Sequence, residues 1–318
     1  MNEVSPIPRD DDRCTLRSAA IGEIAAGSAA SATCWVLLEQ PGAWGRKAAT
    51  QSDLDPELGA RIDALVSSVG GRFGLIREPN KRVSESDDKR VLLIAGGLRG
   101  EPWLVRGTIT DPAKLDRLTT EALTADTPDE VLALFARFVV AREAVALVCT
   151  NGTRDLCCAL EGRPVASEAA RQRQDLVFET SHTGGHRFAP TGVLLPSGFT
   201  FARASAEHVV SAIDAASMGI ITPDLNSLTH NRGMSYLSQP EQVALAFVQE
   251  SLCVARLSGW QLASEDLGDE RWRVRVRREE VDETVLVTHD ASAGETRPLS
   301  CGAEAKLLGR YRAQFSEK

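Results

Sequence analysis

The sequence predicts an α/β protein made of three consecutive units. Short apolar runs of strand type alternate with amphipathic helical patterns along most of the chain. Helix starts with proline at the first helical position occur at Pro56 and Pro128, and period-two alternation returns near the C-terminus. We expect an N-terminal α+β domain over residues 1–115, a central domain over residues 116–220, and a small α+β unit of one helix and a β-hairpin over residues 221–318.

The first unit is predicted to form one sheet with a covering helix. Residues 1–30 are polar and small, and we expect them to lie loosely over this domain. The apolar run 33–39 predicts a buried strand, and Asp55 followed by Pro56 predicts a helix that ends near Val69. Three further strands are predicted, over residues 72–76, 90–95 and 103–109.

The second unit begins with Thr127-Pro128-Asp129-Glu130, which predicts a helix with a capping box. The elements predicted after it are a strand over 144–148, a helix over 166–173, a strand over 176–180, a hairpin over 192–203 and a helix capped by Ser205. This order is typical of a thioredoxin-like domain. It places two loops at strand ends, where side chains can reach a ligand.

The third unit carries a second capping box, Ser238-Gln-Pro-Glu241, which predicts a helix. Residues 272–277 and 285–288 alternate with period two and predict a β-hairpin. We expect a last helix that carries Leu307 and Leu308, and no internal repeat stands out in the sequence.

Two short loops of the second unit carry four residues suited to hold a metal. Cys149 and Cys158 have C-x8-C spacing, and His182 and His186 have H-x3-H spacing. Thiolate and imidazole are ligands for zinc and for iron–sulfur clusters, and nearby glycines allow the backbone to approach closely. We interpret the four residues as ligands of a [2Fe–2S] cluster, with the cysteines on one iron and the histidines on the other.

These motifs resemble a known family. VCTNGTRDLCCALEGRPVA together with SHTGGHRFAPTGVLLPSG is similar to the sucrase/ferredoxin-like proteins, which are related to thioredoxin-like [2Fe–2S] ferredoxins. WVLLEQPGAWG and NRGMSYLSQPEQVA resemble bacterial members. Cys149 and Cys158 match the family's cysteine pair, and His182 and His186 match its histidine pair. Cys157, an addition beside the matched cysteine, is an alternative second thiolate.

The resemblance implies single-electron transfer or redox sensing with a redox partner protein, either a reductase or an electron acceptor. We therefore expect a non-enzymatic electron carrier rather than an enzyme. Zinc bound by the same Cys2His2 set, in a structural or interaction protein, is the main alternative. The word sucrase in the family name implies glycoside hydrolysis. That reaction needs a pair of carboxylates, and the spacing of Asp and Glu in this sequence identifies no such pair.

The remaining cysteines and the overall composition limit which classes of protein fit the sequence. Seven cysteines are an odd number in a 318-residue chain, which argues against a disulfide scaffold. Cys157 and Cys158 could form a redox-active pair, and Cys14, Cys34, Cys253 and Cys301 are predicted to be apolar fillers. With a formal net charge of −8, no membrane-length apolar run and no signal peptide, we expect a cytoplasmic protein without nucleic-acid or membrane partners.

Overall fold

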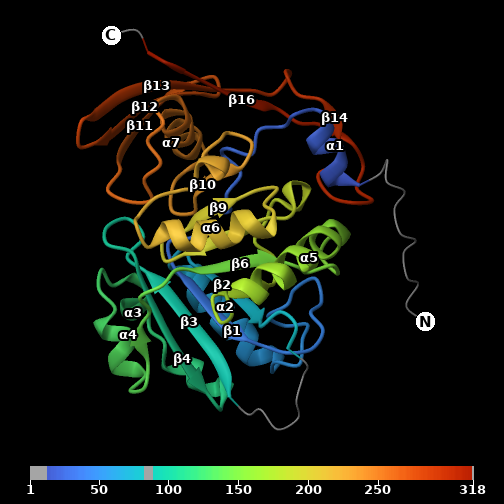
Figure 1. Ribbon diagram of the computed structural model, residues 1–318, viewed down its shortest axis with the longest axis vertical. Helices are drawn as coiled ribbons and strands as arrows, with labels where there is room; N and C mark the ends of the chain where they lie inside the picture. The colour runs from blue at the N-terminus through green and yellow to red at the C-terminus, as the bar shows by residue number, and fades with distance from the viewer. Residues whose placement is uncertain (1–12, 82–88, 317–318) are drawn as a thin grey trace.

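The computed structural model describes residues 13–81 and 89–316 and shows a mixed α/β protein. One ten-stranded sheet runs through the molecule, and a separate four-stranded sheet covers helix α7 (Gln239–Ser251) at one end (Figure 1). The α/β prediction is confirmed. Among the described residues, no helix combines the length and the apolar character needed to cross a membrane.

The N-terminal half of the large sheet follows the sequence prediction closely. Its elements are β1 (Trp35–Glu39), α2 (Pro56–Ser68), β2 (Arg72–Arg77), β3 (Arg90–Gly96) and β4 (Trp103–Ile109). β1 and β2 are parallel because α2 connects them as a crossover, whereas β3 and β4 form an antiparallel hairpin beside β1. Asp55 caps α2, since its carboxylate accepts a hydrogen bond from the N–H of Leu58 at 2.7 Å.

The second half of the sheet repeats this topology. Its elements are β6 (Val145–Cys149), α5 (Leu156–Gln172), β7 (Val177–Thr180), β8 (Gly192–Leu195), β9 (Phe199–Phe201) and α6 (Ala206–Ala216). Outward from the middle of the sheet, the order β7-β6-β8-β9 matches the order β2-β1-β3-β4. The halves meet where β2 and β7 pair antiparallel, with Ile76 opposite Thr180.

The sheet continues across both predicted domain boundaries. β5 (Val139–Val140) pairs with β4 at one edge, and β10 (Asn231–Met234) pairs with β9 at the other. The division into units at residues 115 and 220 therefore stays a prediction. The short helical segments are η2 (Pro112–Arg117), α3 (Thr120–Thr124), α4 (Asp129–Leu134), η3 (His186–Phe188) and η4 (Pro223–Leu225).

The C-terminal part forms the smaller sheet on α7 (Gln239–Ser251). Its strands are β11 (Gln261–Gly268), β12 (Arg271–Arg278), β13 (Val281–Asp290) and β16 (Arg310–Phe315), and the short pair β14 (Thr296–Arg297) and β15 (Lys306–Leu307) lies beside it. The predicted hairpin is confirmed. The predicted last helix is wrong, because residues that follow Leu307 extend along β13, where Ala313 pairs with Val287.

Two predictions near the chain start and at α4 also need correction. Residues 25–30 do not lie over the first domain: the N–H groups of Ala25 and Ala29 donate to the carbonyls of Leu228 and Arg232. Residues 1–12, which the same prediction covers, lie outside the described residues. The predicted capping box at Thr127 is absent, because the Thr127 hydroxyl donates to the Asp129 carboxylate at 3.0 Å and leaves the helix N–H groups uncapped by it.

The largest correction concerns α5, which starts ten residues before the predicted helix at 166–173 and includes both cysteines of the Cys157–Cys158 pair. Asp155 caps it by accepting from the N–H of Cys157 at 2.9 Å. A Cβ on Gly162 would lie 2.2 Å from the carbonyl oxygen of Cys149. The close packing of α5 on the end of β6 thus outweighs the poor helix propensity of Gly162 and Pro164.

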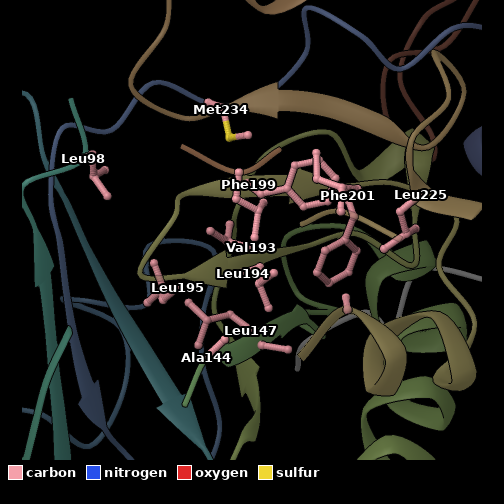
Figure 2. Packing of buried hydrophobic residues seen from close by; sticks show 14 of the residues in the cluster. Leu98, Ala144, Leu147, Val193, Leu194, Leu195, Phe199, Phe201, Leu225 and Met234 are labelled. Atoms are coloured by element: carbon pink, nitrogen blue, oxygen red, sulfur yellow. The ribbon is translucent and has the colours of Figure 1, made fainter. Parts of the chain in front are cut away.

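A continuous apolar core joins the sheet to its helices. Figure 2 shows part of it, where side chains from neighbouring strands of the second half interlock. The labelled residues include Leu147 of β6, Val193, Leu194 and Leu195 of β8, Phe199 and Phe201 of β9 and Met234 of β10. Leu98, which follows β3, belongs to the same core, so this core extends into the first half of the sheet. A second apolar cluster packs α2 against the first half through Val36, Leu38 and Ile62.

We predict that Gly162→Ala destabilises the protein by about 1–3 kcal/mol, because the added methyl group overlaps the Cys149 carbonyl. The direction of the change in unfolding free energy is informative, because glycine-to-alanine changes inside ordinary helices stabilise by about 1 kcal/mol. Urea unfolding measures the difference. The control is Gly100→Ala, whose added methyl group would lie 4.0 Å from the carbonyl oxygen of Gly97 and should leave stability unchanged or slightly higher. A Gly162→Ala protein as stable as wild type would contradict the close packing of α5 on β6.

Candidate metal centre

The structure brings three of the four predicted ligands into one group. Cys149 is the last residue of β6, Cys158 lies in the first turn of α5, and His182 follows β7. The two sulfur atoms and a ring nitrogen of His182 all lie within 4.8 Å of one another. His186, the first residue of η3, is close to this group, with its ring centre 5.5 Å from that of His182.

The donor atoms are withdrawn from solvent, and two of them have no partner. Cys149 and Cys158 are fully buried. The Nδ1 atoms of His182 and His186 are buried and accept or donate no hydrogen bond within the described residues. An unsatisfied buried polar atom costs about 1–3 kcal/mol, and coordination to a metal would remove that cost. The donor set therefore fits a thiolate- and imidazole-bound metal or cluster.

The histidine loop depends on glycine. Gly184 and Gly185 have φ angles of +80° and +67°, in the left-handed region that other residues rarely adopt. A Cβ on Gly185 would also lie 2.3 Å from the Arg232 guanidinium. These two glycines let the chain reverse between the histidines and bring both rings to the same side of the loop as the thiols.

The local electrostatics favour one thiolate in the absence of a metal. A hydrogen bond from Cys158, together with donation from His182 and from the backbone N–H of Thr183, holds the pKa of Cys149 well below its usual range. The same hydrogen bond to Cys149, with burial, raises the pKa of Cys158. The pair therefore shares one proton. Burial lowers the pKa of His186 and keeps the ring in the neutral form that binds metals.

A buried arginine donates a hydrogen bond to the loop that carries the histidines. Arg232 on β10 is 0% exposed, and its Nη1 donates to the carbonyl of Gly184 at 3.0 Å and to the Thr191 hydroxyl at 2.7 Å. Its Nε donates to the Ser28 hydroxyl at 3.0 Å. Burial lowers its pKa to about 9. The guanidinium offsets part of the negative charge of the thiolates.

Sequence reasoning missed Arg232, although it lies in the NRGMSYLSQPEQVA segment noted above. A single arginine in a short strand gives no local signal that it is buried. The segment lies some 50 residues beyond the histidines, and only the pairing of β10 with β9 brings it beneath their loop.

Cys157 lies in a different environment from Cys158. Its sulfur is 3.1 Å from that of Cys301, and it belongs to a second group of potential ligands, which also includes Cys14 and Asp155. The structure therefore places Cys158, rather than Cys157, beside Cys149. The two neighbouring thiols do not face each other, so the geometry does not favour a redox-active pair between them.

We predict that Arg232→Met destabilises the protein by about 2–4 kcal/mol, because the carbonyl and hydroxyl groups that the guanidinium pairs become buried and unsatisfied. Chemical unfolding of the protein measures the change. Arg271→Met is the matched control, since the Arg271 side chain is 49% exposed and should change stability by less than about 0.5 kcal/mol. Equal stability of the two variants would show that the Arg232 contacts contribute nothing.

The comparisons with known proteins identify the family. The sucrase/ferredoxin-like family model matches residues 25–226, a span that includes all four predicted ligands and ends shortly before Arg232. No curated protein and no solved structure matches the chain. Because the family model covers more than half of the sequence, the chain belongs to the sucrase/ferredoxin-like family.

Proposed function

We propose that this protein holds a [2Fe–2S] cluster through Cys149, Cys158, His182 and His186 and acts in single-electron transfer or redox sensing. The observation that carries the proposal is the set of two buried thiols and two unpartnered imidazole nitrogens in a sucrase/ferredoxin-like chain. When bound, such a cluster takes up and releases one electron. We propose an electron carrier rather than an enzyme.

The residues divide into a deep side and an outer side. The cysteines are fully buried, whereas the His186 side chain is 17% exposed. The histidine side is therefore where an electron enters or leaves. Two neutral imidazoles in place of thiolates make the site less negative and raise its reduction potential, and the buried charge of Arg232 acts in the same direction.

A cavity of about 620 Å³ lies next to the histidine loop, and Gly185 and Arg187 form part of its wall. Arg187 is held by Glu23, whose carboxylate accepts its hydrogen bond at 2.9 Å. This hollow gives a redox partner protein, a reductase or an electron acceptor, a way to approach the histidines. We place this exchange in the cytoplasm, where the seven free cysteines would stay reduced.

The topology of the second half agrees with this proposal. Strands β6 to β9 with α5 and α6 follow the element order that the sequence predicts for a thioredoxin-like domain. We propose that this half is such a domain and that the ligands come from its two strand-end loops.

Zinc is a second candidate for the same site, and a specific observation favours it. Two sulfurs and one imidazole nitrogen within 4.8 Å of one another can all reach a single ion, because ligands of tetrahedral zinc lie about 3.3–3.8 Å apart. A dinuclear cluster instead requires the cysteine pair and the histidine pair to be further apart. Zinc would make this a structural or interaction domain without a redox role.

Glycoside hydrolysis finds little support at this site. The reaction needs two carboxylates on opposite sides of a sugar bond. Asp155, the carboxylate next to His186, is 4% exposed, and its two oxygens accept hydrogen bonds from the N–H groups of Cys157 and Cys301. It is committed to structure rather than open to a sugar.

The first test is anaerobic purification followed by a visible spectrum and analysis of iron, zinc and sulfide. We expect charge-transfer bands in the visible range with iron and acid-labile sulfide in equal amounts. A colourless protein that contains zinc at Cys149 and Cys158, and no iron after reconstitution with iron and sulfide, would contradict the proposal.

We predict that Cys158→Ser abolishes or strongly weakens iron and sulfide binding, whereas Cys157→Ser retains both. The reason is that Cys158 faces Cys149 and Cys157 faces Cys301. Iron and sulfide content per chain, measured after identical reconstitution of the two variants, gives the comparison. The opposite result would make Cys157 the second thiolate.

We predict that His182→Cys keeps the cluster but lowers its reduction potential, because a thiolate replaces a neutral imidazole. A spectroscopic redox titration measures the potential. His208→Cys is a suitable control, since the His208 ring accepts a hydrogen bond from the N–H of Ser205, the cap of α6, and belongs to neither group of potential ligands. An unchanged potential in the His182 variant would remove His182 from the ligand set.

A further inference from the structure

A second group of metal-binding side chains forms where three distant parts of the chain meet. Cys14 lies on α1 (Cys14–Ala20), Asp155 and Cys157 lie at the start of α5, and Cys301 lies in the C-terminal segment between β14 and β15. One ligand atom from each of the four residues lies within 4.8 Å of all the others. Figure 1 shows α1 beside β14, although these two elements are far apart in the sequence.

The distances between these atoms are close to those of a tetrahedral site. The sulfur of Cys301 is 3.1 Å from that of Cys157 and 3.7 Å from that of Cys14. The Cys14 sulfur is 3.8 Å from Oδ1 of Asp155. Ligands held about 2.3 Å from one zinc ion are separated by about 3.8 Å, so small shifts would allow all four to bind it.

The group is buried, and hydrogen bonds hold its side chains in place. Cys14, Asp155 and Cys157 are at most 4% exposed. The N–H groups of Cys157 and Cys301 each donate to the Asp155 carboxylate at 2.9 Å, which fixes its orientation and leaves lone pairs that face the sulfurs. The Thr15 hydroxyl donates to the Cys157 sulfur at 3.2 Å, as groups behind a metal-bound thiolate do.

A disulfide explains these contacts less well. Three sulfurs meet here, so any one disulfide would leave the third thiol buried beside it. All of them are free in this structure. The carboxylate also has no role in a disulfide, whereas carboxylate oxygen is a common fourth ligand of zinc. Asp155 and Cys157 lie at the N-terminus of a 17-residue helix, whose dipole stabilises the negative charge of the ligands.

We propose that Cys14, Asp155, Cys157 and Cys301 bind one structural Zn²⁺, separate from the centre at Cys149. Cys14 and Cys301 lie outside the span of residues 25–226 that the family model matches, so this site joins parts of the chain that the family pattern does not include. The zinc ties both terminal segments to the first turn of α5. That turn also carries Cys158, and Asp155 Oδ2 lies 3.7 Å from Nε2 of His186. The second site thus lies directly beside the first.

The test is metal analysis of the full chain and its variants, purified without oxygen and then incubated with Zn²⁺ and passed over a desalting column. We expect Cys301→Ser and Cys14→Ser each to lose one equivalent of zinc per chain relative to wild type and to keep the metal bound at Cys149. Cys158→Ser should keep this zinc. Cys253→Ser, which changes an exposed cysteine, should change neither metal.

The variants separate this proposal from the proposed function. If the first centre also binds zinc, wild type holds two equivalents, and Cys301→Ser and Cys158→Ser each remove a different one. If only Cys158→Ser lowers the zinc content, the second site does not exist.

A measurement on wild-type protein guards against variants that fail to fold. With Co²⁺ replacing zinc at the second site, we expect the absorption of a tetrahedral ion with thiolate charge-transfer bands, and alkylation of Cys14 and Cys301 should slow when Zn²⁺ is bound. Rapid alkylation unaffected by Zn²⁺, or a Cys157–Cys301 disulfide found by mass spectrometry in metal-loaded protein, would overturn the proposal.

Discussion

The contact between α5 and the end of β6 is the constraint on which the candidate metal centre depends. Gly162 allows the helix to lie directly against the Cys149 carbonyl, and this fixes where the first turn of the helix starts. Cys158 then faces Cys149, and Cys157 faces away from it toward Cys301. Asp155 caps the helix and lies between the two groups of ligands. One helix terminus therefore organises both groups of potential metal ligands.

The fold could be predicted wherever local pattern and tertiary packing agree. The strands around Trp35 and Val145 are apolar runs, and the helix at Pro56 carries its own cap and proline, so propensity alone identifies them. Prediction failed where long-range contacts decide the outcome. Helix α5 contains Gly162 and Pro164 and forms because it packs on β6, and the residues after Leu307 pair with β13 instead of forming a helix.

In the candidate site too, residues with a local sequence signal could be predicted and residues brought together by long-range contacts could not. Spacing and residue type single out Cys149, Cys158, His182 and His186 as candidate ligands, because paired donors on short loops leave a local signal, and the structure brings three of them into one group. Arg232 leaves none. The second group was hidden for a further reason: its cysteines come from both ends of the chain and have no common spacing, so Cys14 and Cys301 resemble isolated apolar residues until the fold brings them together.

The proposed function requires that two cysteines and two histidines hold a [2Fe–2S] cluster. Pulsed electron paramagnetic resonance of the reduced, reconstituted protein tests it most directly, because directly bound imidazole nitrogen couples strongly to the unpaired electron spin. We expect couplings from two nitrogens, one of which disappears in His182→Cys and the other in His186→Cys. A cluster signal without strong nitrogen coupling, or a protein that binds no iron at all, would contradict it.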